Sequence, residues 1–394
     1  MNANPKNPII GVRSFGETPD LVSRHVHSAI MGLKKGAILS TAKHFPGHGD
    51  TAQDTHRLLP TVDKNLDDLL QQDLVPFQSA IDAGVDIIMT SHILYPQIDP
   101  KNPATLSKII LQDILRTKMG FKGIIVTDSM NMWAMRKNYD PMEAAVRAIN
   151  AGASLVMLSE EVYENSLGGY KQKQIQTIQG VIQAVEKGNI PIHIINDALR
   201  VVLQYRYYHP AFHVPTTLNK NTYDTDTHHN LAYQGAKQAI KVLRNDCNAF
   251  PLHGGHFILI GTSNPAMQDK ILECRGIGPN DEKQVIEVLQ ERLNANNTNY
   301  TPIAYADIPA FLNSNNTDTT PIILITENYP IAGYDHDVDA QADIVNAFVK
   351  TYGDRVIVIA LRSPYEIDQY HDLKTYVCAY SSRPVSAQVI GDML

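Results

Sequence analysis

The sequence predicts a two-domain α/β protein. Between residues 18 and 208, short apolar runs with the length of strands alternate with helical patterns, which is the order expected of a parallel sheet covered by helices. A second alternation of this kind begins after a polar stretch. The active site of a (β/α)8 barrel lies at the carboxyl ends of its strands. Polar residues follow the strand ends of the first domain in that manner, at Lys43 and His44, at His92, at Asp128 and at Ser159.

The first domain begins with a predicted helix and strand. Apolar residues recur at helical spacing over residues 18–35, with a proline near the start of the segment and a glycine after its end. The apolar run Ala37–Ala42 predicts a strand, which would deliver Lys43 and His44 to a loop. A proline and a glycine then end the strand pattern.

Further helices and strands of the first domain follow in alternation. A helix is expected from about Leu66 to Asp82, with Pro76 as a local break. The almost continuous apolar run Val85–Ile93 is typical of a parallel strand that is covered on both faces. The remaining expected elements are a helix over 106–115, a strand at Gly123–Thr127, a helix opened by Asp140-Pro141 and closed by Gly152, a strand at Leu155–Leu158, and helices around 175–186 and 197–208.

A linker is expected between the two domains. Residues 209–230 are rich in Pro, Thr, Asn, Asp and His and contain few apolar residues, so we expect domains at 1–208 and 231–394. The second domain is expected to end in an incomplete helix, Ser386–Leu394. Its other expected elements are helices at 231–243, 282–294 and 339–352 and strands at 256–261, 321–326, 355–361 and 375–380.

Composition and charge limit the classes of function. The 394-residue chain is 43% hydrophobic and 19% charged, which is ordinary for a soluble globular protein. Its formal charge of -7 and its pI near 6.1 argue against a nucleic-acid or anionic-membrane partner. Cys247, Cys274 and Cys378 are widely spaced and odd in number, so neither a disulfide framework nor a zinc site is indicated.

The sequence carries no pattern that directs a protein to a membrane or out of the cell. No apolar run approaches the ~20 residues of a membrane span. The first residues, MNANPKNP, lack the charged and apolar regions of a signal peptide. The chain as given is therefore expected in the cytoplasm, or in the periplasm or outside the cell if a longer chain carries a signal peptide upstream.

The loop from Lys43 to His56 is the strongest candidate for a functional site. It strings ionisable side chains along a polar segment at the end of a predicted strand, where catalytic groups are often found. Asp54 and His56 lie two residues apart, so they project to the same side of an extended segment. A carboxylate beside an imidazole fixes the tautomer and raises the basicity of the ring, and such a pair can transfer a proton near neutral pH. From the spacing alone, a surface loop with scattered His and Asp is an equally good interpretation.

Four motifs of the first domain resemble one enzyme family. They read IGVRSFGE at Ile10–Glu17, KHFPGHGDTAQDTH at Lys43–His56, IMTSHI at Ile88–Ile93 and IIVTDSM at Ile124–Met130. In this order they resemble glycoside hydrolase family 3, in the branch of β-N-acetylglucosaminidases related to the peptidoglycan-recycling enzyme. The resemblance implies that the first domain holds the last four strands of a (β/α)8 TIM-type barrel and that the second is the α/β/α sandwich found after the barrel. We therefore expect a start site assigned inside a longer gene, or a fragment of one.

For catalysis, the resemblance implies a retaining mechanism. A retaining glycosidase needs a carboxylate nucleophile near the anomeric carbon and a second group that first protonates the leaving oxygen and later activates water. Asp128 takes the place of the nucleophile, His56 that of the acid/base and Asp54 that of the carboxylate that assists the histidine. Without the family, Asp128 could equally cap the segment Ser129–Met135.

For substrate binding, the resemblance implies positions whose charge-assisted hydrogen bonds fix the sugar hydroxyls and the N-acetyl group. These positions fall on Arg13, Lys43 and His44. A solvated surface arginine is the alternative for Arg13. His92 is expected to line the site, with a packed histidine at a strand end as the alternative. His48 and Asp50 are expected to hold the shape of the loop.

The leading functional hypothesis is a retaining exo-β-N-acetylhexosaminidase that acts on terminal β-linked GlcNAc of cell-wall fragments or chitin oligosaccharides, without a metal or organic cofactor. A histidine acid/base would let phosphate approach the glycosyl intermediate, so a phosphorylase is one alternative. A truncated, catalytically incompetent fragment is another. An open half barrel would expose strand edges and an apolar inner face, which favours self-association.

Overall fold

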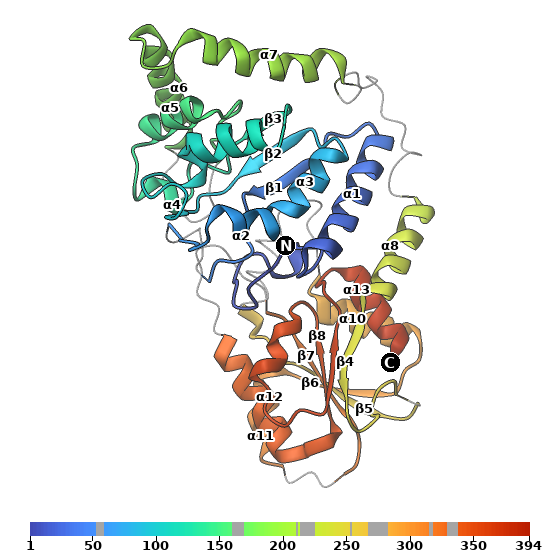
Figure 1. Cartoon of the computed structure of the whole chain (residues 1–394). Coiled ribbons are helices and arrows are strands. Elements are labelled where there is room, and N and C mark those ends of the chain that lie inside the picture. The colour runs from blue at the N-terminus through green and yellow to red at the C-terminus, as the bar shows by residue number, and fades with distance from the viewer. Residues whose placement is uncertain are drawn as a thin grey trace. The chain divides into compact units, whose positions relative to one another are not determined.

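Two compact units make up the chain, Met1–Thr217 and Leu218–Leu394. Figure 1 shows the computed structural model. The finer domain boundaries at 208 and 231 stay a prediction. None of the described helices is long and apolar enough to span a lipid bilayer. The residues that the structure describes are 1–52, 59–159, 169–209, 212, 225–252, 254–266, 283–314, 318–328 and 338–394.

A three-stranded parallel sheet forms the centre of the first unit. Its strands, in spatial order, are β1 (Thr41–Phe45), β2 (Ile87–Thr90) and β3 (Ile124–Val126). Beyond β3, Val126 forms a single parallel bridge with Leu155, where the sequence predicts a full strand. Within the described residues β1 pairs only with β2, so the outer edge of β1 is open.

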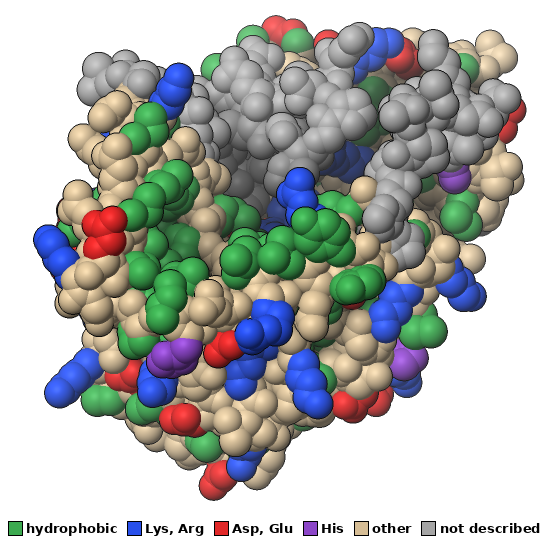
Figure 2. Space-filling view, turned by 90° about the horizontal axis from the view of Figure 1, so that it is seen from above, with side chains coloured by type: hydrophobic (Ala, Val, Ile, Leu, Met, Phe, Trp, Pro, Cys, Tyr) green, Lys and Arg blue, Asp and Glu red, His purple; other side chains and the backbone are tan. Residues whose placement is uncertain are grey.

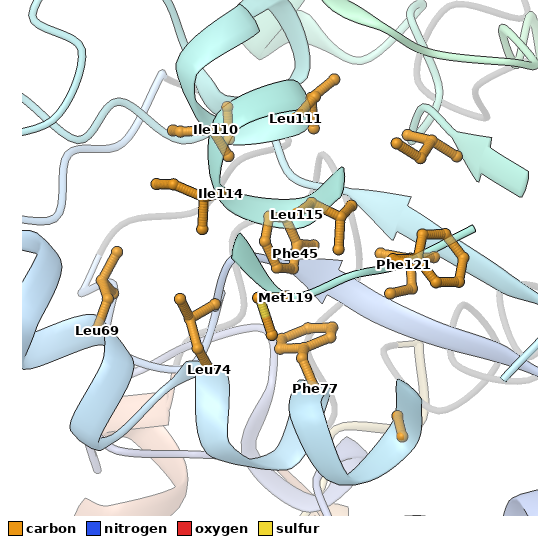
Figure 3. Packing of buried hydrophobic residues seen from close by; sticks show 14 of the residues in the cluster. Phe45, Leu69, Leu74, Phe77, Ile110, Leu111, Ile114, Leu115, Met119 and Phe121 are labelled. Atoms are coloured by element: carbon orange, nitrogen blue, oxygen red, sulfur yellow. The ribbon is translucent and has the colours of Figure 1, made fainter. Parts of the chain in front are cut away.

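Helices cover this sheet through a continuous hydrophobic core. Phe45 of β1 meets Phe77 edge to face, with ring centroids 5.2 Å apart, which is a favourable geometry for an aromatic pair. Figure 3 shows Leu74 and Leu115 pointing into the same core from two different helices. The helices are α1 (Pro19–Lys35), α2 (Leu66–Gln71), α3 (Leu74–Asp82) and the π-helical η3 (Ile109–Lys118).

The first strand begins later than its apolar pattern predicts. The run Ala37–Ala42 is apolar, but Ala37 adopts a left-handed conformation with φ 55°. Its N–H donates to a carbonyl in the last turn of α1 at 3.0 Å, so it closes that helix. The strand is therefore Thr41–Phe45, and Lys43 and His44 belong to the strand itself rather than to the loop after it.

The helix predicted over 66–82 is interrupted at a different position from the one expected. α2 ends at Gln71 and α3 begins at Leu74, so the helix is interrupted at residues 72 and 73 and not at Pro76. Pro76 lies in the first turn of α3. Backbone N–H groups in a first turn have no acceptor within the helix, so a proline there removes no hydrogen bond.

The later helices of the first unit lie near their predicted positions, except for the short helix Trp133–Arg136, which the sequence does not predict. The capping prediction for α5 (Pro141–Ala151) is confirmed: the Asp140 carboxylate accepts hydrogen bonds from two backbone N–H groups of the first turn, and Gly152 follows the helix with φ 116°. The others are α4 (Trp133–Arg136), α6 (Tyr170–Glu186) and α7 (Ile192–Tyr208). Hydrophobic side chains of α6 and α7 are exposed, and Figure 2 shows hydrophobic side chains on the face seen from above.

A six-stranded sheet forms the centre of the second unit. The spatial order is β4-β9-β8-β7-β5-β6, and every neighbouring pair is parallel except β4 with β9. The sequence does not predict β4 and β6, because these two edge strands are half-exposed and carry polar residues. The strands are β4 (Lys241–Asn245), β5 (Phe257–Gly261), β6 (Tyr300–Ile303), β7 (Ile322–Thr326), β8 (Val356–Ala360) and β9 (Thr375–Cys378).

Hydrophobic clusters line both faces of this sheet. Leu259 and Ile323 belong to one cluster, together with residues of α10 and α13. Ile258 and Leu324, their neighbours along the strands, belong to the other cluster with residues of α12. Alternation along the strands therefore gives the expected α/β/α sandwich. Its helices are α8 (Asp226–Ala239), α10 (Val285–Ala295), α11 (Ile308–Leu312), α12 (Val338–Tyr352) and α13 (Pro384–Met393).

The helix α8 begins earlier than the predicted 231–243. Thr225 caps it, because its side chain accepts a hydrogen bond from the His228 N–H and the His228 ring accepts one from the Thr225 N–H. The helix therefore starts inside the stretch 209–230. It also ends earlier than predicted, and the residues from Lys241 onward pair as β4.

Candidate active site

Two polar side chains meet at the carboxyl end of the first sheet. His44 lies in β1, and Asp128 follows β3. The strands are parallel, so their carboxyl ends share one edge of the sheet. The Nε2 atom of His44 is 3.4 Å from the Oδ2 atom of Asp128. The two side chains are 6% and 22% exposed, so the pair is largely shielded from water.

Burial and charge act in opposite directions on this pair. Burial lowers the pKa of His44 well below the usual histidine value, and Asp128 only partly opposes that effect. Burial also disfavours the charged form of Asp128, but its neighbours outweigh burial and lower its pKa; these are His44, His92, the Ser129 N–H and Lys43. Burial therefore favours the neutral form of His44, and the groups around Asp128 favour its carboxylate form.

Two cations flank the pair. Lys43 precedes His44 in β1, and Arg13 ends the short helix η1 (Gly11–Arg13). The Lys43 side chain as a whole is exposed, but burial of its ammonium end against the surrounding protein lowers its pKa. Arg13 adds to this effect, and Asp128 opposes it. The charged groups are therefore close enough to influence one another. Both Lys43 and Arg13 are exposed, so their donors are accessible to a hydroxyl or anionic group of a ligand.

His92 lies directly behind the nucleophile candidate. It follows β2 and is 1% exposed. Its Nε2 donates to the Ser129 carbonyl at 2.9 Å, since a carbonyl oxygen only accepts, and its Nδ1 is 2.9 Å from the hydroxyl of Thr105. The Ser129 N–H in turn donates to Asp128 at 2.8 Å. His92 therefore holds the backbone beside Asp128, and its contact with a substrate stays a prediction.

Residues from outside the four sequence motifs hold the turn after β1. The contacts are from Tyr95 Oη to the Gly47 carbonyl at 2.5 Å, from Asn7 Nδ2 to the His48 carbonyl at 2.9 Å and from Lys64 Nζ to Asp50 at 2.9 Å. The His48 ring meets the His44 ring edge to face at 5.6 Å. Lone polar residues such as Tyr95 and Asn7 belong to no local pattern, so only the folded chain reveals these contacts.

A cavity of about 300 Å³ lies beside β1. Its polar wall includes Arg13, Lys43 and His44, and its apolar wall is formed by side chains of α1 such as Val26 and Leu33. Because residues of β1 line it, the cavity extends from the candidate site along the first strand. Ligand pockets typically start at about this size.

The predicted acid/base residues, Asp54 and His56, lie outside the residues that the structure describes. Of the other predicted positions, the fold brings His44 and Asp128 together, with Lys43 and Arg13 beside them and His92 behind. Their catalytic and binding roles stay predictions. Among the described residues, no group of three or more His, Cys, Asp or Glu side chains is arranged to hold a metal ion.

Comparison with protein families identifies the first unit. The N-terminal domain of glycosyl hydrolase family 3 matches residues 1–205, which is 205 of 394 residues. This range contains all four motifs of the first domain, and it contains the sheet that carries His44 and Asp128.

The sequence matches cover only part of each similar protein. The chain is 30% identical over 259 residues to a β-hexosaminidase A of Pseudoalteromonas piscicida, covering 62% of this chain and 43% of that protein. It is 38% identical over 156 residues to a β-hexosaminidase of Nitrosomonas eutropha, covering 40% of this chain and 44% of that protein. The matches therefore span less than half the length of these curated relatives.

A solved structure resembles nearly the whole chain. It is a glycoside hydrolase family 3 β-N-acetylglucosaminidase from Paenibacillus sp. str. FPU-7, which is 27% identical with a TM-score of 0.83. The similarity covers 99% of this chain and 71% of that chain. Both units therefore have counterparts in one protein of known structure.

Proposed function

The chain belongs to glycosyl hydrolase family 3, and on this premise we propose that it is a retaining exo-β-N-acetylhexosaminidase. The proposed substrate is a terminal β-linked GlcNAc of cell-wall fragments or chitin oligosaccharides. The observation that carries the proposal is the position of the Asp128 carboxyl group at the carboxyl end of the sheet, 3.4 Å from His44. The β-hexosaminidase and β-N-acetylglucosaminidase names of the similar proteins support the choice of substrate class.

In the proposed mechanism, an oxygen of Asp128 attacks the anomeric carbon while the bond from that carbon to the leaving oxygen breaks. The leaving oxygen receives a proton from the acid/base. Water then gives a proton to the same group and attacks the anomeric carbon, which releases Asp128. The lowered pKa of Asp128 supplies the anion that the first step needs.

The acid/base in this proposal is His56, assisted by Asp54. Their support is the sequence motif and the usual histidine pKa near 6.5, which allows both proton transfers near neutral pH. Lys43 and Arg13 are proposed to bind the sugar from the rim of the site. The Nδ1 atom of His44 is buried and has no hydrogen-bond partner in the described part of the chain.

The test is release of a chromogenic phenol from its β-N-acetylglucosaminide by the purified chain, with and without phosphate. We expect turnover that yields GlcNAc and does not depend on phosphate, and slower turnover of the corresponding β-glucoside, which lacks the N-acetyl group. Formation of GlcNAc 1-phosphate would mean that phosphate, and not water, is the acceptor, so that the reaction is phosphorolysis. Absence of turnover from a folded sample would contradict the proposal for this chain and favour the incompetent fragment.

We also propose that the chain self-associates along the edge of β1. This edge has no strand partner within the described residues. The cavity beside it has an apolar wall, in which Leu33 of α1 is 37% exposed. An open strand edge next to apolar surface favours pairing with another chain, and a second copy is the occupant that is always present in solution.

Replacing Leu33 by Lys is expected to shift the chain towards the monomer, because a charge beside the edge opposes association. Light scattering after size-exclusion chromatography would measure the mass. Ile175→Lys on α6 is the matched control, since Ile175 is also 37% exposed, and it should leave the mass unchanged. A wild-type chain that stays monomeric at high concentration would refute the proposal.

A further inference from the structure

An ion cluster lies beside the turn that follows β1. The Nζ atom of Lys64 is 2.9 Å from Asp50 Oδ2, 2.7 Å from Asp73 Oδ2 and 3.2 Å from Gln72 Oε1. A lysine ammonium has three N–H bonds, so each donor of this side chain has an acceptor. The Lys64 side chain is 14% exposed and that of Asp73 is 3% exposed. Water therefore competes little for these contacts.

The members of the cluster depend on one another for their charges. Burial opposes the charge on Lys64, but hydrogen bonds and charges from Asp50 and Asp73 outweigh burial and raise its pKa. Burial raises the pKa of Asp73, and Lys64 limits that rise. A buried carboxylate that loses a hydrogen-bonded cationic partner becomes costly to keep ionised. Lys64 is thus the centre of the cluster.

The cluster holds the turn Gly47–Asp50 at both of its ends. Asp50 is the last residue of the turn and contacts Lys64 directly. At the other end, the Asp73 side chain packs against Gly47 so closely that a Cβ there would lie 2.9 Å from Asp73 Cβ. Gly47 has φ 156°, which also favours glycine. Lys64 therefore fixes the first residue of the turn through Asp73 and the last one through Asp50.

The turn connects this cluster to the candidate active site. His48 lies between the two anchored ends, and its ring is 5.6 Å from the His44 ring. His44 in turn lies 3.4 Å from Asp128. A displacement of the turn moves His48, which removes the ring that packs against His44 and leaves the orientation of His44 beside Asp128 less well defined. Misplacement of a reacting pair by about 1 Å can cost on the order of 100-fold in rate.

We propose that Lys64 is a positioning residue for the reaction, which holds the His48 turn against His44 and thereby sets the geometry of His44 beside Asp128. This inference rests on the proposed function for its kinetic consequence, but its geometric consequence is independent of turnover. Lys64 acts through the turn and is not itself proposed to contact the substrate.

The kinetic test uses the whole chain and three variants. Lys64→Met keeps the length of the side chain without its charge, and it is expected to lower kcat by on the order of 10- to 100-fold with a much smaller change in KM. Lys64→Arg restores the charge and should recover most of the lost kcat. Asp50→Asn weakens one arm while leaving the Lys64–Asp73 pair intact, so it should lower kcat even if the methionine variant folds poorly.

The matched control is Lys34→Met. Lys34 is an exposed lysine of the first unit whose Nζ donates to the Ala83 carbonyl at 2.8 Å, away from the turn. Its loss should reduce the unfolding temperature without selective loss of kcat. Equal effects on kcat for the variants at 34 and 64 would mean that Lys64 contributes to stability alone, and would overturn the inference.

The geometric test reads the imidazole rings directly. In chains with labelled histidines, the ring signals of His44 and His48 can be identified from their loss in His44→Asn and His48→Asn. Lys64→Met and Asp50→Asn are expected to shift both signals, Lys64→Arg to restore them and Lys34→Met to leave them unchanged. Unshifted signals would overturn the inference even in an inactive chain. Absence of turnover in the wild type, with the shifts observed, would count against the proposed function only.

Discussion

Replacing Asp128 by Asn is expected to lower kcat by on the order of 10⁴-fold or more, with a far smaller effect on KM. The amide keeps the shape of the carboxylate but cannot form the covalent bond to the anomeric carbon. Burial favours the neutral form of His44, so the variant does not leave a buried cation without its partner. The loss should therefore be chemical rather than structural, and the unfolding temperature should stay close to that of the wild type.

A nucleophile can be distinguished from a structural carboxylate by replacing it from solution. In Asp128→Gly, azide or formate can enter the space beside His44 and attack the anomeric carbon from the same face. Azide should restore part of the turnover and leave a glycosyl azide with the α configuration. Asp113→Asn, at an exposed carboxylate of η3, should retain full activity. Retained activity in Asp128→Asn would remove Asp128 from the mechanism.

Sequence patterns predict an element best when residues adjacent in the sequence fix its ends. Asp140 and Gly152 define α5 from the sequence because the cap hydrogen bonds and the left-handed glycine are properties of a few adjacent residues. The start of β1 is not fixed by such local side chains. Its apolar pattern begins at Ala37, but Ala37 also closes α1. The hydrogen bond from its N–H to the helix end keeps Ala37 out of the strand.

The residues of the candidate site also differ in whether a local sequence pattern predicts them. Asp128 can be predicted because a carboxylate after a short buried run is a local pattern, and the family motif adds its role. Lys64 and Tyr95 cannot be predicted in this way, since their importance depends on which backbone and carboxylate groups the fold brings to them. Asp54 and His56 rest on the motif, because they lie outside the described residues.

Replacing Glu366 by Gln is expected to stabilise the second unit above pH 7. Glu366 follows β8 and is 3% exposed. One of its oxygens accepts hydrogen bonds from the hydroxyls of Thr326 at 2.6 Å and Tyr370 at 2.9 Å, whereas Oε1 has no partner within the described residues. Burial raises the pKa of Glu366 to about 7, with a smaller contribution from Glu327. The folded unit therefore favours the protonated carboxyl.

The proton on the Glu366 carboxyl group determines whether stability rises or falls with pH. Between the ordinary pKa of 4.5 and the folded value of about 7, the folded state of Glu366 binds more protons than the unfolded state. The stabilisation from this group is therefore complete below about pH 4.5 and is lost as the pH rises through 7. A shift of about 2.5 units corresponds to about 3 kcal/mol. Glutamine cannot ionise, so Glu366→Gln should not lose stability as the pH rises through 7.

Hydrogen exchange of peptides from β7 and β8, corrected for the intrinsic effect of pH, would measure the result. The protection of the wild type should fall between pH 5 and pH 8, whereas that of Glu366→Gln should stay level and exceed the wild type at pH 8. Glu291→Gln, at an exposed ion pair with Lys283, should keep the wild-type slope. Equal slopes for Glu366→Gln and the wild type would mean that Glu366 ionises in the folded unit at its ordinary pKa. Such a result would require the buried Oε1 to have a donor that stabilises its negative charge.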